Sequence, residues 1–170
     1  MSGIPFLVVA PTALPVSLFE AKNHLRVTHD MEDGLISDLI ASQTAYLDGW
    51  NGVLGRAIMP QTWAQVWTDG ETELFLALPD AYSVIVKSDG VTVSDTLYEL
   101  ELTGKGTKIT LGGVSGSEIR VEYACQMAAA KLPLVKHLVL LMVGNAYENR
   151  SGEIGPDEAI QAKIAALRVV

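Results

Sequence analysis

The sequence predicts an α+β fold, in which a block of antiparallel strands lies between helical segments at the two ends of the chain. Apolar residues recur at helical spacing near both ends of the 170-residue chain, and they alternate with a period of two between about residues 60 and 124. The strand-like stretches also follow one another without intervening helices. We therefore expect an extended apolar arm at 1–16 and a single domain at 17–170, with helices at about 17–52 and 131–168.

Residues 4–16 predict an extended arm, because three prolines interrupt any helix in the run IPFLVVAPTALPV. The apolar side chains of Phe6, Leu7 and Val8 nevertheless need cover. One interpretation is an edge strand or strap on the chain's own domain. The other is an arm that crosses to a neighbouring subunit.

Two helices are predicted after the arm. Residues 17–20 (SLFE) form a capping box, which starts a short helix that ends near Arg26. Thr28 or Asp30 can cap a second helix, which should run to about Trp50 before the glycines at 52 and 55 stop it.

Between residues 60 and 124 the pattern is that of short strands rich in Thr, Val, Trp and Tyr. Trp63, Gln65 and Trp67 should share one face of the first strand, and Asp89-Gly90 predicts a tight hairpin turn. We expect six or seven antiparallel strands, at about 61–68, 73–78, 82–87, 91–93, 97–102, 107–111 and 118–124.

The last part of the chain returns to helical spacing. Pro133 lies at a first-turn position, where its missing amide costs nothing, and opens a helix that should end around Arg150. The broad apolar stripe of this helix predicts burial on more than one side. A final short helix should begin at residues 156–158 and carry Ile160, Ile164 and Leu167 on one side.

Charge and composition exclude several classes of protein. The net charge is −8, and residues 61–124 hold 4 basic against 10 acidic side chains, so a general nucleic-acid binder is not expected. The longest uninterrupted apolar run, at 138–144, is too short to span a bilayer, and the N-terminus lacks the basic start of a signal peptide. The single cysteine, Cys125, rules out an internal disulfide and fits a cytosolic protein.

No catalytic or cofactor motif stands out, and we expect no cofactor and no metal. The nearest approach to a constellation is formed by His24, His29 and Asp30, which leaves open a small metal-dependent hydrolase as the alternative function. A solvated loop between helices explains these three residues better. Trp63 and Trp67 could stack nucleic-acid bases, but their acidic surroundings favour core or interface packing.

Several stretches of the sequence are informative when they are considered together. They are LxxAKxxLRV at 18–27, HDxEDxLIxxLIA at 29–41, GRA at 55–57 followed by QTW at 61–63, IRVEY at 119–123, and LVLLMVGNAYENR at 138–150. Taken together, they resemble the head-tail connector, or adaptor, proteins of tailed bacteriophages and gene transfer agents. The stretch that ends in YENR is the most specific of them.

This resemblance implies a structural head-completion protein of the virion neck, not an enzyme. It also implies that the fold is a small antiparallel α-helical bundle with an inserted antiparallel β region. Connectors of this family form a ring, usually of twelve copies, beneath the portal protein at the capsid vertex. A tail terminator or other neck and tail proteins dock on the ring, and DNA passes through it without specific binding. We accordingly expect no membrane partner, and a location in the bacterial host cytoplasm during assembly. A tail-completion component remains the other possibility within the same context.

In a ring, one patch of each protomer binds a different patch of the next protomer, so we expect two interaction surfaces on the chain. Acidic residues of the 61–124 block should line or flank the channel, because they repel phosphate. The candidates for subunit or partner contacts are Ile4, Phe6, Leu7, Val8, Trp63, Trp67, Ile160, Ile164 and Leu167.

Overall fold

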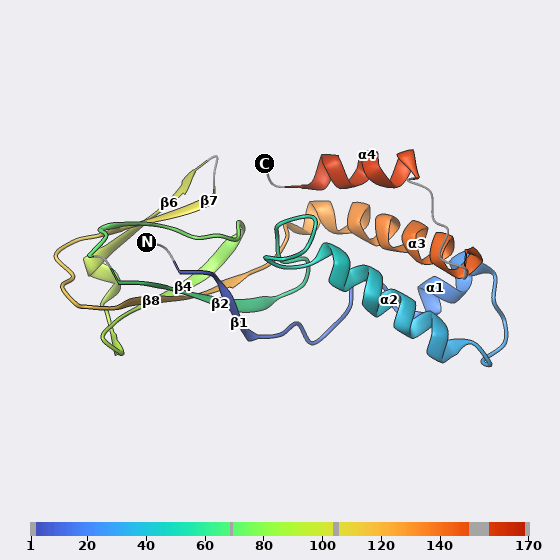
Figure 1. The fold of residues 1–170 in the computed structure, drawn as a ribbon, viewed down its shortest axis with the longest axis horizontal. Coiled ribbons are helices and arrows are strands. Elements are labelled where there is room, and N and C mark those ends of the chain that lie inside the picture. The colour runs from blue at the N-terminus through green and yellow to red at the C-terminus, as the bar shows by residue number, and fades with distance from the viewer. Residues whose placement is uncertain (1–2, 69, 104–105, 150–156, 169–170) are drawn as a thin grey trace. The chain divides into compact units, whose positions relative to one another are not determined.

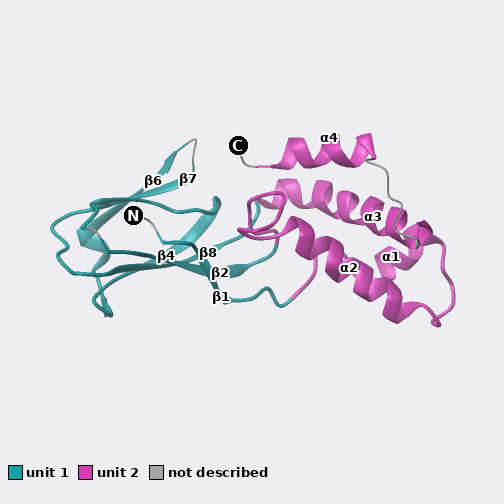
Figure 2. Cartoon of the chain, in the orientation of Figure 1, with its two compact units in different colours: residues 1–12, 59–127, 170 teal, residues 13–58, 128–169 magenta. Residues whose placement is uncertain are grey.

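The computed structural model describes residues 3–68, 70–103, 106–149 and 157–168. These residues form four α-helices and antiparallel sheets, which confirms the α+β class. The chain divides into two compact units (Figure 2). Unit 1 consists of residues 1–12 and 59–127 with residue 170, and unit 2 consists of residues 13–58 and 128–169.

Unit 1 contains a five-stranded antiparallel sheet in the order β1-β2-β8-β4-β5 (Figure 1). The central strand β8 pairs along its whole length with both β2 and β4, and its side chains alternate between buried and half-buried. This alternation is the period of two that the sequence shows. The strands are β1 (Phe6–Val9), β2 (Gln61–Trp67), β4 (Ala81–Ser88), β5 (Val91–Thr92) and β8 (Ile119–Cys125).

A second sheet of unit 1 has the order β3-β7-β6 and is also antiparallel. Its strands are β3 (Glu73–Phe75), β6 (Tyr98–Thr103), which follows the short 3-10 helix η1 (Asp95–Leu97), and β7 (Gly106–Leu111). Buried side chains from the two sheets form the core of the unit, with Trp67, Val121 and Tyr123 from the first and Leu74 and Ile109 from the second. The predicted second strand is shorter than expected, since it ends at Phe75.

The predicted Asp89-Gly90 hairpin turn is confirmed. Ser88 pairs with Val91, and both turn residues have positive φ, 48° at Asp89 and 83° at Gly90. Two such residues in succession match the twist of the flanking strands. The Asp89 carboxylate accepts hydrogen bonds from the Ser117 hydroxyl and from the amides of Ser117 and Glu118, which holds its pKa below the ordinary value.

Unit 2 contains the four helices, of which α3 contacts each of the other three (Figure 1). The buried faces of α2 and α3 include Ile36, Ile40, Leu138 and Val139, and Val143 extends the buried surface of α3 beyond a single stripe, as predicted. The helices are α1 (Leu18–Leu25), α2 (Asp33–Leu47), α3 (Leu132–Glu148), which follows the 3-10 helix η2 (Ala129–Lys131), and α4 (Glu158–Leu167).

The two predicted N-terminal caps have different outcomes. The capping box at Ser17 is present, because the Ser17 side chain accepts from the Glu20 amide and the Glu20 carboxylate accepts from the Ser17 amide. The cap of α2 by Thr28 or Asp30 is wrong. Glu32 is the N-cap residue and makes no side-chain cap, while the Asp30 carboxylate accepts from Lys22 Nζ instead. The helix α2 also ends at Leu47, before Trp50.

Several expected features lie outside the described residues. They are the stretch from residue 150 to Pro156 and parts of the turns at Asp69 and at Gly104-Lys105. The long helix, which was expected to end around Arg150, ends at Glu148. By length and a mean hydropathy of 1.2, the described stretch Ala129–Glu148 could cross a membrane. The buried core helix of a protein outside the membrane can have the same length and hydropathy, and α3 contacts three other helices. The expectation that the protein does not span a membrane stays a prediction.

Candidate interaction surfaces

The strand β1 places the N-terminal apolar residues at one edge of the five-stranded sheet. It pairs with β2, with Phe6 opposite Ala64 and Leu7 opposite Trp63, and the Gly3 amide donates to the Val66 carbonyl at 2.8 Å. Residues 6–9 therefore form an edge strand on the chain's own sheet, which is the first of the two interpretations of the arm. Pairing of these residues with β2 leaves the other edge of β1 as the border of the sheet.

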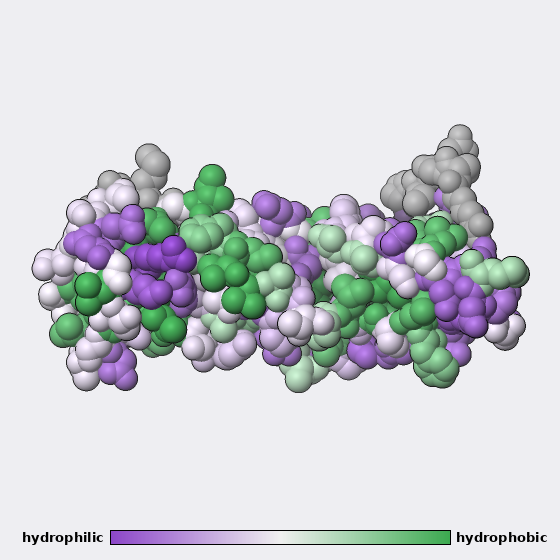
Figure 3. Space-filling view, turned by 90° about the horizontal axis from the view of Figure 1, so that it is seen from below, coloured by the Kyte–Doolittle hydropathy of each residue, from purple (hydrophilic) through white to green (hydrophobic). Residues whose placement is uncertain are grey.

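The side chains of β1 are nevertheless exposed. Phe6, Leu7 and Val8 are each exposed by 42–45%, and Ile4 by 81%. Hydrophobic side chains gather over this part of unit 1 in the view of Figure 3. We call residues 4–9 the β1 surface. An apolar strand edge of this kind can accept another chain, although whether it does stays a prediction.

Next to β1, the outer face of the same sheet carries a charged cluster. The Glu122 carboxylate lies 3.0 Å from Lys87 Nζ and 2.9 Å from Arg120 Nε. The Lys87 bond is the main reason that the pKa of Glu122 is lowered. The Arg120 guanidinium lies 5.3 Å from the Phe6 ring centroid, within the range of a cation–π contact. This cluster anchors Phe6 of β1 to the sheet.

The other candidate contact residues are buried within the chain itself. Trp63, Gln65 and Trp67 share a buried face of β2, as predicted. The Trp63 indole donates to Gln61 Oε1 at 2.9 Å, and Gln65 Oε1 accepts from the Tyr123 hydroxyl and from the Ala77 amide. Burial raises the pKa of Tyr123. Trp63 and Trp67 are thus core residues of unit 1, and an interface role for them stays a prediction.

The residues of α4 are placed in a similar way. Ile160, Ile164 and Leu167 are exposed by no more than 7%, so they form the buried side of that helix, as their spacing predicts. Beside them an apolar groove of about 420 Å³ lies between α3 and α4. It is lined by Leu134, Ala159, Ala162, Lys163, Ala166 and Leu167.

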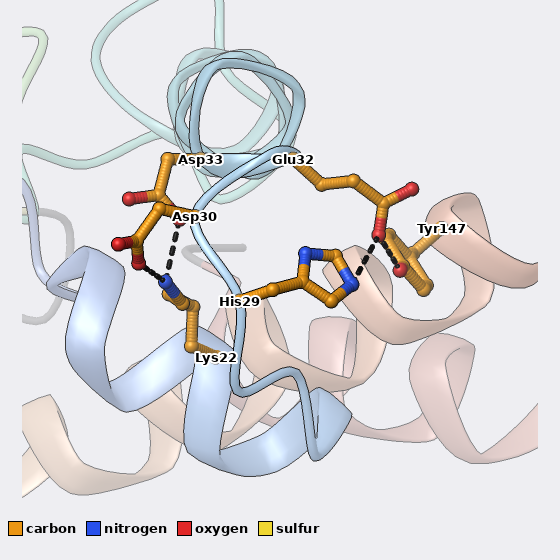
Figure 4. Close-up of polar contacts among 6 residues, drawn as sticks. All are labelled: Lys22, His29, Asp30, Glu32, Asp33 and Tyr147. Atoms are coloured by element: carbon orange, nitrogen blue, oxygen red, sulfur yellow. Dashed lines mark hydrogen bonds and ion pairs between the residues drawn. The ribbon is translucent and has the colours of Figure 1, made fainter.

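The residues of the alternative hydrolase do not come together as a metal site. Within the described ranges, no group of three or more His, Cys, Asp or Glu residues is arranged to hold a metal ion. Asp30 and Asp33 instead both pair with Lys22, whose Nζ lies 2.7 Å from Asp30 Oδ1 and 2.6 Å from Asp33 Oδ1 (Figure 4). The hydrogen bonds that Lys22 donates to these carboxylates raise the pKa of Lys22, and the one to Asp30 lowers the pKa of Asp30.

The two histidines lie in different surroundings. His29 Nε2 is 3.8 Å from the Glu32 carboxylate, to which the Tyr147 hydroxyl also donates (Figure 4). His24 instead borders a pocket of about 250 Å³ with Pro133, His137, Leu140 and the ion pair of Glu20 and Lys136. These contacts tie α1 and the 26–32 loop to α3. Their arrangement is that of helix packing and not of acid–base catalysis.

The strand β6 corresponds to the strand predicted at about 97–102, but its exposure was not predicted. Four of its six residues are exposed, and Leu100 and Leu102 are exposed by 52% and 80%. The alternation of apolar and acidic residues in YELEL, at 98–102, already indicated a strand with one apolar and one acidic face. It could not show that the apolar face would remain uncovered.

Solved structures of two particles contain chains that are similar to almost the whole of this chain. One similar chain is in the neck of an empty gene transfer agent particle, solved with C6 symmetry; it has a TM-score of 0.77 and 18% identity over 98% of this chain and 96% of that one. A chain of the native gene transfer agent virion matches with a TM-score of 0.74 and 18% identity over the same shares of both chains.

The chain shares its fold with gene transfer agent neck and virion chains. This similarity of fold agrees with the resemblance of the sequence to head-tail connectors. It extends over both units of the chain. Both similar chains are components of an assembled particle. The sequence likewise predicts a structural component of a particle and not an enzyme. No family model matches the sequence, and no curated protein matches it significantly.

Proposed function

We propose that the chain is a structural neck protein that acts as a head-tail connector, or adaptor. Copies form a ring beneath the portal protein, tail components dock on the ring, and DNA passes through it. The observation that carries this proposal is the fold likeness to a gene transfer agent neck chain across 98% of this chain and 96% of that one. The likeness extends over almost the whole length of both chains and does not rest on one shared motif.

The distribution of charge supports the same role. The 61–124 block holds 10 acidic and 4 basic side chains, and exposed carboxylates such as those of Glu99, Glu101 and Glu118 lie in this block. An acidic wall lets DNA slide past, because it repels phosphate and offers no cations for counterion release. In unit 2, the contacts of α3 with three helices fit the small antiparallel bundle of the proposed connector.

The β1 surface is the proposed contact with a neighbouring copy. It combines an open strand edge with apolar side chains that the chain's own core leaves half exposed. A second copy can cover these side chains either by adding a strand or by packing a different patch against them. Because such an interface joins two unlike patches, repeated application closes a ring when the rotation between copies allows it.

The direct test is to measure the mass of the purified chain alone and after mixing with the portal protein of the same particle. We expect the free chain to be monomeric and the mixture to contain a complex with several copies of the chain on each portal ring. Electron microscopy of the mixture should place the chain on the tail-facing end of the portal. If the chain does not bind the portal at any concentration at which it stays folded, the adaptor role is wrong.

A pair of variants assigns the contact within that complex. Ile4→Glu/Val8→Glu adds two charges to the β1 surface, where both side chains are exposed by 42% or more. The matched control, Phe19→Glu/Met31→Glu, adds the same charges at residues of unit 2 that are exposed by 72% and 87%. We expect only the first variant to lose assembly while both keep the circular dichroism spectrum of the parent. Equal assembly of the two variants would remove the β1 surface from the proposal.

A further inference from the structure

The strand β6 is an open edge of the three-stranded sheet. It pairs with β7 on one side, with Leu100 opposite Ile109 and Glu101 opposite Lys108. In the described part of the chain no strand pairs with its other side. The backbone amides and carbonyls along that side are therefore available to another extended segment.

The two faces of this edge differ in chemistry. Residues opposite one another in an antiparallel pair share a face, so Leu100 lies on the same face as Ile109 and Leu74. Ile109 and Leu74 are fully buried, whereas Leu100 is 52% and Leu102 80% exposed. The apolar face of the sheet thus continues past the chain's own core and ends at two uncovered leucines.

The opposite face is acidic at the same edge. Glu101 lies across from Lys108, and the ammonium of Lys108 is already paired with the Glu73 carboxylate at 2.7 Å. Glu99 lies across from Thr110, which carries no charge. Three carboxylates share this face with the single lysine of β7, so a positive side chain brought next to β6 finds an excess of negative charge.

A second copy of the chain does not supply the complementary strand. A strand that matches both faces needs basic residues two positions apart, and no two Lys or Arg residues of this chain have that spacing. The strand β1 carries no charge at all. Pairing of β6 with β6 of another copy sets glutamates beside glutamates, which repel one another.

From this edge we infer that β6 binds an extended segment of a different protein, in which basic residues alternate with apolar ones. The segment adds a fourth strand beside β6. Its apolar side chains cover Leu100 and Leu102, and its Lys or Arg side chains lie next to Glu99 and Glu101. The backbone supplies affinity, and the alternation of the side chains supplies specificity. This inference rests on the sheet edge and does not depend on the proposed neck role.

The first test uses the full chain and a synthetic peptide of about eight residues, the length of an ordinary strand, in which lysine and valine alternate. Fluorescence anisotropy should show saturable binding. A peptide of the same composition with its lysines and valines in two separate blocks should bind at least about tenfold more weakly, because it cannot match both faces. Hydrogen exchange should show that the peptide protects the β6 amides and leaves the β1 amides unchanged.

Charge reversal of the edge sharpens the test. Glu99→Lys/Glu101→Lys should weaken the lysine–valine peptide about tenfold or more, because favourable cross-strand pairs become repulsive. The same variant should gain binding to a glutamate–valine peptide, which a misfolded protein cannot do. The control Glu118→Lys, a single charge reversal at an exposed carboxylate outside β6, should change either affinity less than about twofold.

Three results overturn the inference. They are no binding of the alternating peptide, equal binding of the alternating and the block peptides, and protection of β1 in place of β6. Any of them shows that the glutamates of β6 serve only to keep the edge free of other strands.

Discussion

The two units of the chain bury their apolar residues to different extents. Of the 19 large hydrophobic residues that are exposed in the described part of the chain, 12 belong to unit 1, which also carries 10 acidic and only 4 basic side chains. Unit 2 has 10 acidic and 8 basic side chains, and its helices turn their apolar faces toward one another. A helix satisfies its own backbone, while a sheet has edges that something must cover or protect. Unit 1 is therefore the better candidate for contacts with other chains.

The largest effects should come from the two cores. Trp67→Ala in unit 1 and Leu138→Ala in unit 2 remove fully buried side chains, and we expect them to lower the free energy of unfolding by about 3–5 and 2–5 kcal/mol. If residues 17–170 form one domain, both variants should shift one common transition in urea, followed by tryptophan fluorescence and circular dichroism. Two separate transitions, each moved by one variant, would divide the chain into independently folding units.

A smaller effect is expected where the loop before α2 meets α3. Tyr147→Phe removes the hydroxyl that donates to the Glu32 carboxylate, and should cost about 1 kcal/mol of the free energy of unfolding. Tyr46→Phe is the control, because Tyr46 is 52% exposed on α2. A stability equal to the parent in both variants would show that this contact adds nothing to the packing of unit 2.

The capping box of α1 should contribute a similar or slightly smaller amount. Ser17→Ala removes the side chain that accepts from the Glu20 amide at 3.2 Å, and we expect a loss of about 1 kcal/mol in the free energy of unfolding. Ser42→Ala within α2 should leave stability equal or slightly higher, since alanine is the better helix former. Equal losses at the two serines would contradict a specific role for the cap.

The smallest expected effect is on pH dependence. Hydrogen bonds from the Ser17 amide, Lys136 and the Ser17 hydroxyl lower the pKa of Glu20 from 4.5 to about 2. The carboxylate therefore stabilises the folded chain above pH 4.5, and this contribution is lost as the pH falls toward 2. Its side chain is 41% exposed, so we expect only about 0.5 kcal/mol.

Glu20→Gln should make the free energy of unfolding less dependent on pH between 4.5 and 2. Urea titrations of the parent and the variant at several pH values in this window measure the difference. Parallel curves for the two proteins would show that Glu20 has the same pKa in the folded and unfolded chain.

Local signals were sufficient for most of the elements. The alternation of Trp63, Gln65 and Trp67 predicted a strand face, and Asp89-Gly90 predicted a hairpin turn, because period and turn chemistry act over a few residues. The predicted cap of α2 was wrong because a tertiary contact competes for the capping side chain. The Asp30 carboxylate, which could have capped the helix, is held by Lys22 of another element.

The candidate contact residues show the same limit more clearly. Spacing predicted that Ile160, Ile164 and Leu167 share one apolar side, but a pattern cannot tell whether its own chain or a partner covers that side. The structure buries these residues within unit 2 and leaves Leu100 and Leu102 uncovered in unit 1. Pairing between β1 and β2, more than fifty positions apart in the sequence, likewise depends on the folded sheet.

The glutamates of β6 also have a practical consequence for handling the purified protein. At low ionic strength, their mutual repulsion keeps the strand edges of separate molecules apart, so a concentrated stock should stay clear. In about 1 M salt the range of that repulsion shrinks to about 3 Å, while the apolar surface of Leu100 and Leu102 remains exposed. A stock stored in high salt should then turn cloudy with time, and dilution into a low-salt buffer should slow the change.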